Sequence, residues 1–143
     1  MANPWSLGRR DAAIDPADFA LPAGASSNTL SEAIDLGSAI AGGKNPRIEE
    51  MEIAVLVPAL TATMLPNTRT LTIDLQDSAD NVTYTDRLAT VGVMTGAGGV
   101  GASAAEFRVK IPSDTLRYIK VQATTGVSTT TMAAVSATVH VMF

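Results

Sequence analysis

The sequence has no cysteine and a single histidine, His140. Without cysteine the chain can form neither a disulfide framework nor a thiolate metal site. One imidazole cannot supply the several histidine ligands that an enzyme on a cupin-like scaffold needs for its metal. We therefore expect no metal and no cofactor, and we expect His140, on the outward register of the last strand, to be a surface or interface residue.

Basic and aromatic residues are also scarce. Ten Lys and Arg stand against 14 Asp and Glu, which gives a formal net charge of −4. A nucleic-acid-binding protein normally carries a basic stripe, so we expect no nucleic-acid partner. Aromatic residues make up 4% of the chain and hydrophobic residues 46%. The core must therefore be built from small and β-branched side chains, which suit packed sheets.

Long apolar runs are missing as well. The longest uncharged apolar run covers residues 53–60 and falls far short of the roughly 18–20 residues that a membrane span needs. Residues 1–10 contain two arginines with no apolar segment after them, so we expect no secretory signal. These observations predict a protein that is made in the cytoplasm and has no membrane partner.

A strict alternation of apolar and polar residues marks the centre of the chain, residues 69–85. The apolar residues that share one face are Leu71, Ile73 and Leu75. Residues 77–81 are short and polar and favour a turn, after which a β-prone pattern resumes at Val82. The segment therefore predicts a β-hairpin that buries one face.

The same alternation recurs from residue 30 onward. It predicts further strands at residues 30–36, 50–57, 87–91, 106–111, 116–123 and 132–143. Proline and glycine turns separate these segments, and no interior helix longer than a turn or two is predicted. About seven or eight short strands without βαβ units indicate an all-β fold, an antiparallel β-sandwich of jelly-roll type, with a barrel as the alternative.

Residues 1–28 differ from the rest and are interpreted as an extended arm ahead of a β-sandwich domain at residues 29–143. The arm has three prolines, the only tryptophan, Trp5, and no sustained alternation. A floppy terminus is the alternative. Large apolar residues are wasteful in a solvated tail, so we interpret Trp5, Phe19 and Leu21 as anchors for a partner.

Residues 96–101 match the dinucleotide-binding pattern G-x-G-x-x-G. That pattern binds a pyrophosphate only when a strand precedes it and a helix follows it. Only about five residues separate it from the next predicted strand, which leaves no room for the crossover helix. A flexible loop that contacts a partner is the better interpretation.

Carboxylates are concentrated in and near the hairpin turn, where they invite a calcium interpretation. The candidate oxygen ligands are Asp74, Asp77, Asp80 and Asn81. A calcium loop needs alternating ligands, a fixed glycine and a terminal glutamate, and this segment lacks that pattern. We interpret these residues as turn formers. No carboxylate pair, serine motif or histidine motif indicates catalysis, so we expect no catalytic residues and no enzyme.

Four segments in series resemble the small capsid decoration, or cement, proteins of tailed bacteriophages. They are LSEAIDLG at residues 30–37, LTIDLQDSAD at residues 71–80, residues 108–111 before a proline turn, and LRYIKVQ at residues 116–122. A Thr/Gly-rich turn and a closing apolar strand follow. The resemblance covers residues 29–143.

The resemblance implies a jelly-roll protein of the virion that binds the outer surface of an expanded icosahedral capsid. Such proteins bridge major capsid protein subunits and associate with themselves as dimers or trimers. The residues we expect to contact the capsid are Trp5, Arg9, Arg10, Phe19, Leu21 and Arg47, the arginines by pairing with acidic capsid groups. The alternative is a carbohydrate- or receptor-binding β-sandwich of a phage particle, which would need an exposed aromatic platform.

Overall fold

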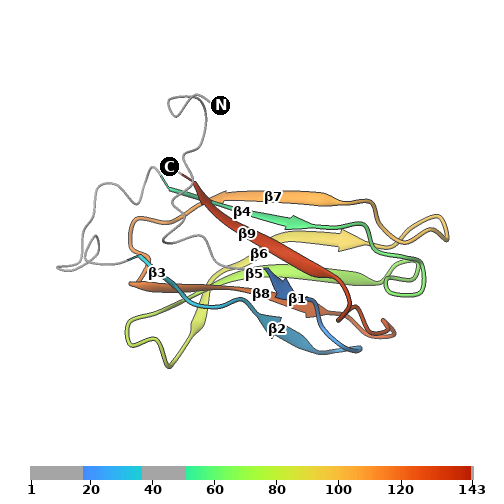
Figure 1. Ribbon diagram of the computed structural model, residues 1–143, viewed down its shortest axis with the longest axis horizontal. Coiled ribbons are helices and arrows are strands. Elements are labelled where there is room, and N and C mark those ends of the chain that lie inside the picture. The colour runs from blue at the N-terminus through green and yellow to red at the C-terminus, as the bar shows by residue number, and fades with distance from the viewer. Residues whose placement is uncertain (1–17, 37–50, 143) are drawn as a thin grey trace.

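The computed structural model describes residues 18–36 and 51–142, and these residues form β-strands and no helix (Figure 1). The nine strands of the described ranges are β1 (Phe19–Ala20), β2 (Asn28–Leu30), β3 (Ile34–Asp35), β4 (Glu52–Val57), β5 (Thr70–Ser78), β6 (Thr85–Thr95), β7 (Ala105–Lys110), β8 (Tyr118–Thr125) and β9 (Ser136–Met142). The predicted all-β fold is confirmed.

The strands form two antiparallel sheets that lie face to face (Figure 1). The first sheet has the order β1-β9-β4-β7, and the second has the order β2-β8-β5-β6, with β3 also pairing with β8. The pairing is nested, because β1 pairs with β9, β2 with β8, β4 with β7 and β5 with β6. The predicted antiparallel β-sandwich is therefore confirmed, and most of its neighbouring strands are distant in sequence.

The core lies between the sheets and is built from aliphatic side chains at alternating strand positions. In β5, the predicted inner face is confirmed, because Leu71, Ile73 and Leu75 are buried. The corresponding buried positions of β4, β8 and β9 are Ile53, Val55, Val57, Ile119, Val121, Ala123, Ala137, Val139 and Val141. Full burial of a Val, Leu or Ile side chain contributes about 1.5–3 kcal/mol, so these positions dominate the stability of the sandwich.

The hairpin differs from the prediction at its turn. The return strand β6 begins at Thr85 and not at Val82, whose side chain is 81% exposed. The amides of Val82 and Thr83 both donate to Oδ1 of Asp80 at 2.9 Å. These hydrogen bonds, that from Thr83 foremost, lower the pKa of Asp80. The polar turn is therefore longer than predicted, and Asp80 stabilises it in the manner predicted for a turn residue.

β6 is an irregular edge strand. Its register against β5 shifts between Ile73 and Leu75 and again before Gln76. Thr90 in this strand has a φ of 64°, a left-handed conformation that β-branched residues rarely adopt. Its amide donates to Oδ1 of Asp74 on β5 at 2.6 Å. In a regular antiparallel pair a backbone carbonyl would accept this hydrogen bond, so the Asp74 side chain takes its place. Such irregularity discourages an edge strand from pairing with another chain.

The predicted strand at residues 30–36 is split into two short strands, β2 and β3. Leu30 is 41% exposed whereas Ile34 is buried, so these two side chains do not share a face as predicted. Ser31 causes the interruption, because its amide donates to the carbonyl of Val121 at 2.9 Å and its Oγ accepts from the Val121 amide at 3.0 Å. The chain then pairs with β8 again at Ile34.

The predicted boundary of the arm at residue 28 is wrong, because residues 18–28 belong to the sandwich. In β1, Phe19 lies opposite Ala137 of β9, and Leu21 follows directly. Phe19 and Leu21 are only 7% and 1% exposed. The interpretation of these two residues as anchors for a partner is therefore also wrong. Pairing with β9 places both side chains in the core of their own chain.

His140 occupies the outward register that the alternation predicts, since its neighbours Val139 and Val141 point into the core. It is nevertheless only 8% exposed, and Ala54, its partner in β4, is 1% exposed. His140 is therefore buried and not an exposed surface residue, whereas the other half of the expectation, a role as an interface residue, stays a prediction.

Candidate protein-binding surface

Four loops gather at one end of the sandwich, the right-hand end in Figure 1. They are the β1–β2 loop at residues 21–27, the β4–β5 loop at residues 58–69, the β6–β7 loop at residues 96–104 and the β8–β9 loop at residues 126–135. Antiparallel, nested pairing brings them together, because each of these loops joins strands that leave and re-enter the sandwich at the same end. We call this surface the loop end.

Hydrogen bonds between the loops hold the loop end together. Leu60 and Ala102 exchange two backbone hydrogen bonds of 2.9 Å, which join the β4–β5 and β6–β7 loops. The hydroxyl of Thr130 donates to the carbonyl of Thr63 at 2.8 Å. The amide of Met132 in the β8–β9 loop donates to the carbonyl of Pro22 in the β1–β2 loop at 3.0 Å. Each of the four loops is therefore hydrogen-bonded to a neighbouring loop, and the surface is pre-organised for a partner.

The glycine-rich loop is built into this framework. The amide of Ala97 donates to the carbonyl of Gly101 at 3.0 Å, and the amide of Gly99 donates to Oδ1 of Asn67 at 2.8 Å. A Cβ at Gly101 would lie 2.0 Å from the carbonyl oxygen of Leu60, and Gly101 has a φ of 83°. The sequence predicted a flexible loop, whereas the structure shows a hydrogen-bonded loop that needs glycine for its close packing.

The same loop does not have the surroundings of a dinucleotide site. It connects β6 of the second sheet to β7 of the first sheet, and β7 begins at Ala105, directly after the loop. No helix follows whose N-terminus could meet a pyrophosphate. The glycines of residues 96–101 therefore serve the turn and the close packing of two loops.

The loop end is almost free of charge. Arg69 is the only charged residue in these four described loops, although charged residues make up 17% of the whole chain. The exposed residues there are mainly Ala, Gly, Ser and Thr. Val100 and Val127 project from this surface and are 78% and 60% exposed. Depletion of charge together with exposed apolar side chains is typical of the centre of a protein–protein interface.

A hollow of about 750 Å³ opens beside the glycine-rich loop. Leu60 and Ala102 line it from the cross-linked loops, Val93 from β6 and Phe107 from β7, and Val100 stands at its border. Its walls are mostly apolar and carry no ionisable side chain. The hollow therefore suits an apolar side chain of a protein partner better than a charged or strongly polar small molecule.

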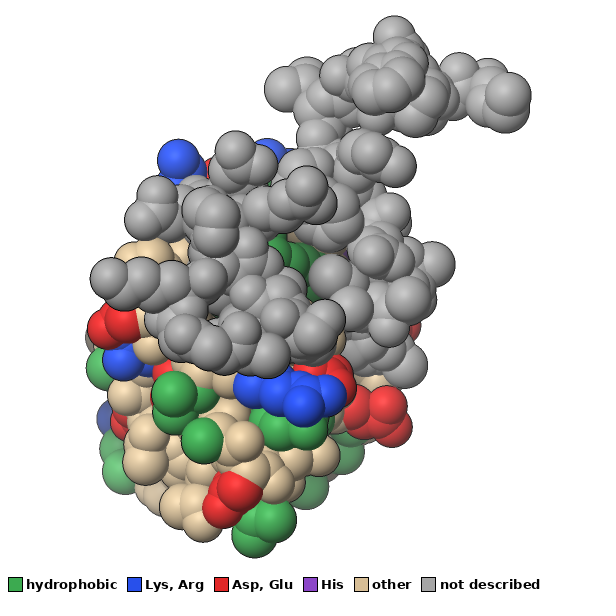
Figure 2. Space-filling view, turned by 90° about the vertical axis from the view of Figure 1, so that its left-hand side faces the viewer, with side chains coloured by type: hydrophobic (Ala, Val, Ile, Leu, Met, Phe, Trp, Pro, Cys, Tyr) green, Lys and Arg blue, Asp and Glu red, His purple; other side chains and the backbone are tan. Residues whose placement is uncertain are grey.

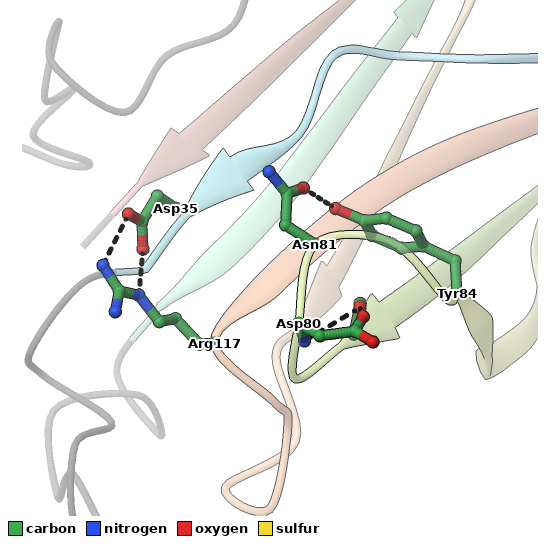
Figure 3. A network of polar contacts seen from close by, with 6 residues as sticks. Asp35, Asp80, Asn81, Tyr84 and Arg117 are labelled. Atoms are coloured by element: carbon green, nitrogen blue, oxygen red, sulfur yellow. Dashed lines mark hydrogen bonds and ion pairs between the residues drawn. The ribbon is translucent and has the colours of Figure 1, made fainter.

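The opposite end of the sandwich has a different character. Acidic and basic side chains lie among apolar ones on this face (Figure 2). Arg117 donates to both carboxylate oxygens of Asp35 at 2.9 and 3.0 Å (Figure 3), and this contact raises the pKa of Arg117. Arg87 pairs with Asp114 and lowers the pKa of that carboxyl. The described part of this end therefore carries charged side chains that pair with one another.

The two half-buried tyrosines at this end, Tyr84 and Tyr118, do not form an open aromatic platform. Nζ of Lys120 lies 4.5 Å from the centre of the Tyr84 ring, and the guanidinium of Arg117 lies 5.0 Å from that of Tyr118. Each cation covers one ring face, against which a sugar would otherwise stack. These two tyrosines therefore do not provide the open aromatic platform that the carbohydrate-binding alternative would need.

The carboxylates that invited a calcium interpretation do not converge on one point. Oδ1 of Asp74 accepts from the Thr90 amide, Oδ2 of Asp77 accepts from the Leu116 amide at 3.0 Å, and Asp80 holds its own turn. The described residues contain no group of three or more His, Cys, Asp or Glu that could hold a metal ion. Each of these carboxylates serves as an acceptor for backbone amides.

The residues that the sequence indicated as contacts fall into two groups. Phe19 and Leu21 lie in the core, as described above. The predicted contacts that lie outside the described residues are Trp5, Arg9, Arg10 and Arg47. Sequence reasoning missed the loop end as a surface. The only sequence feature that marks this surface is the lack of charge in four separate segments, and that feature becomes informative only when the structure shows that the segments are neighbours.

Neither a scan against protein-family models nor a search of curated proteins finds a match for this chain. The described residues include no helix that is long and apolar enough to cross a membrane. The surface just described is therefore the main basis for assigning a function.

Proposed function

We propose that this chain is a structural protein of a tailed-phage virion, a decoration protein that binds the outer surface of the expanded capsid. In this role it bridges major capsid protein subunits and stabilises the shell mechanically. The proposal rests first on the loop end, a rigid and nearly uncharged surface of interface character. It rests second on the sequence resemblance at residues 29–143.

We further infer that the sandwich is of the jelly-roll type. The nested pairing of β1 with β9, β2 with β8, β4 with β7 and β5 with β6 supports this inference. It is the order expected when a long antiparallel hairpin rolls up into two packed sheets, an architecture that recurs in viral capsid domains. The same architecture serves many functions, so the fold alone does not carry the proposal.

The proposed mechanism depends on many modest contacts. A shell with packaged DNA is under outward pressure, and each decoration protein adds an interface between neighbouring subunits. When several copies are linked, the second contact becomes intramolecular and the combined affinity can exceed that of one contact by about 10²–10⁴. This role needs no reaction chemistry, which is consistent with a surface built from Ala, Gly, Ser, Thr and Val side chains.

Co-sedimentation of the purified protein with expanded and unexpanded capsids tests the proposal. We expect binding to expanded shells and an increase in the temperature at which those shells open. A second sample should lack residues 1–17, which leaves β1 and the core intact, and reduced binding of this sample would assign the arm a role in docking. If the full chain fails to sediment with expanded shells at any concentration, the proposed function is wrong.

A further inference from the structure

We propose that the N-terminal segment of this chain, residues 1–17, docks on the outer face of the first sheet and inserts Trp5 into a hollow there. This inference goes beyond the proposed function, because the contact lies within one chain and needs no capsid. It leaves the hollow and the projecting valines of the loop end available to the capsid. It also gives Trp5 a different partner from the capsid surface that the sequence resemblance implied.

The outer face of the first sheet is apolar along its middle strand. β4 lies between β9 and β7 (Figure 1), and most of it falls within the longest uncharged apolar run of the chain. Its inward residues belong to the core, and its outward residues include Ala54 and Leu56. The outward residues of β5, a middle strand of the second sheet, include Thr72, Asp74 and Gln76. A strand that is apolar on both faces is normally covered on both, so the outer face of β4 is suited to bind a further segment.

A second hollow, of about 430 Å³, lies on this face, and we call it the outer-face hollow. Leu56 pairs with Glu106 of β7 on one side and with Thr138 of β9 on the other. Residues directly opposite each other in antiparallel strands point to the same face, so these three lining residues place the hollow on the outer face. The other lining residues are Val57, Pro58, Ala104 and Ala105. The volume lies within the range of about 300–1,000 Å³ that is typical of ligand pockets.

The walls of the outer-face hollow suit an indole ring. Glu106 is the only ionisable residue that lines it, and its carboxylate is paired with Arg108. A tryptophan side chain is large and mainly apolar, but its N–H needs a hydrogen-bond acceptor when it is buried. The carboxylate of Glu106 and the hydroxyl of Thr138 both line the hollow and can accept that bond. Trp5 is the only tryptophan of the chain.

The described part of the chain begins at the border of the outer-face hollow. Asp18 is the first described residue, and its Oδ1 accepts from the hydroxyl of Thr138, a lining residue, at 2.7 Å. Residues 1–17 are therefore joined to the chain beside the hollow. The segment from Trp5 to Asp18 can span up to about 43 Å when extended, so its length does not limit the contact. A tether of this kind gives an effective concentration of about millimolar, so even a contact of modest affinity is populated.

The fluorescence of the full chain without capsids tests this inference, because Trp5 is the only tryptophan. We expect emission at a shorter wavelength than in the urea-unfolded chain, and quenching by acrylamide that is severalfold weaker. Leu56→Asp places a carboxylate on the wall of the outer-face hollow and should return both signals to near those of the unfolded chain. Ala104→Asp, at an exposed position of the same wall, should do the same without disturbing the core.

Leu30→Asp is the matched control, because it makes the same chemical change on the other sheet. Leu30 lies in β2 of the second sheet and is 41% exposed. This variant should leave the emission wavelength and the quenching of Trp5 unchanged. Circular dichroism and thermal unfolding should show that all three variants are folded.

The inference is overturned if acrylamide quenches Trp5 as strongly in the full chain as in the unfolded chain. It is also overturned if Trp5 stays shielded in Leu56→Asp and Ala104→Asp, or if Leu30→Asp exposes it equally. Shielding that is lost on dilution would assign the outer-face hollow to a second copy, and shielding that appears only with expanded capsids would assign Trp5 to the capsid. Either result refutes docking within the chain, and the second leaves the proposed function standing. A shielded Trp5 in a chain that does not sediment with expanded capsids would support this inference and refute the proposed function.

Discussion

Phe107 of β7 lies directly against Gly92 of β6, so that a Cβ added to Gly92 would be 2.1 Å from Cδ1 of the ring. This contact joins the edge strands of the two sheets and also shapes the hollow at the loop end, where Phe107 is a lining residue. The glycine is required here by the space that the ring occupies.

Gly92→Ala should therefore destabilise the protein by about 1–3 kcal/mol, the usual cost of forcing extra atoms into a packed site. In a Phe107→Ala background the ring is gone, so the same substitution should cost little. Urea unfolding of the wild type, the two single variants and the double variant measures the coupling free energy between Gly92 and Phe107. An equal cost in both backgrounds would show that the ring is not the obstacle.

At Thr90, where the backbone is strained, a substitution by glycine should not lower the free energy of unfolding. Its φ of 64° costs an L-residue about 1–2 kcal/mol relative to glycine, and glycine loses about 0.5–1 kcal/mol more through chain entropy. Thr90→Gly should therefore leave the free energy of unfolding unchanged or raise it by up to about 1.5 kcal/mol. Thr72→Gly, at a regular position of β5, is the control and should lower it by about 1 kcal/mol.

Gly101 and Gly24 should respond very differently to alanine. At Gly101 the new Cβ would lie 2.0 Å from the carbonyl oxygen of Leu60, whereas at Gly24 nothing lies within 4 Å. Gly101→Ala should cost at least about 2 kcal/mol through strain and displaced backbone, and Gly24→Ala should be near neutral. Chemical denaturation compares the two. Similar values would mean that the glycine-rich loop yields easily and is not the rigid element described above.

The turn at Asp80 predicts a pH dependence. The amides of Thr83 and Val82 and the Ser78 hydroxyl lower the pKa of Asp80 below its ordinary value of 3.8. Because the folded-state pKa is the lower one, the contribution of Asp80 to stability is present above pH 3.8 and is lost as the pH falls through the folded value. The difference in unfolding free energy between the wild type and Asp80→Ala should be constant near neutral pH and shrink in stronger acid. An NMR titration that places the Asp80 midpoint above 3.8 would contradict this.

Alternation in the sequence predicted several strands and their buried faces well. In β5 and β8 the inward residues, such as Ile73 and Val121, are those that the pattern indicated. The reason is local, because successive side chains of any extended strand point to opposite faces. Alternation failed at Leu30, where the hydrogen bonds of Ser31 with distant β8 interrupt the strand.

The sequence by itself determined that the protein is all-β and which faces of most strands are buried. Only the tertiary structure decided that Phe19 and Leu21 complete the core, because their burial depends on pairing with β9 at the other end of the chain. Only the tertiary structure also brought four uncharged loops together into one surface. Side-chain alternation repeats every two residues and is visible in any short segment. The choice of neighbouring strands depends on contacts between residues that are far apart in the sequence, which local patterns do not encode.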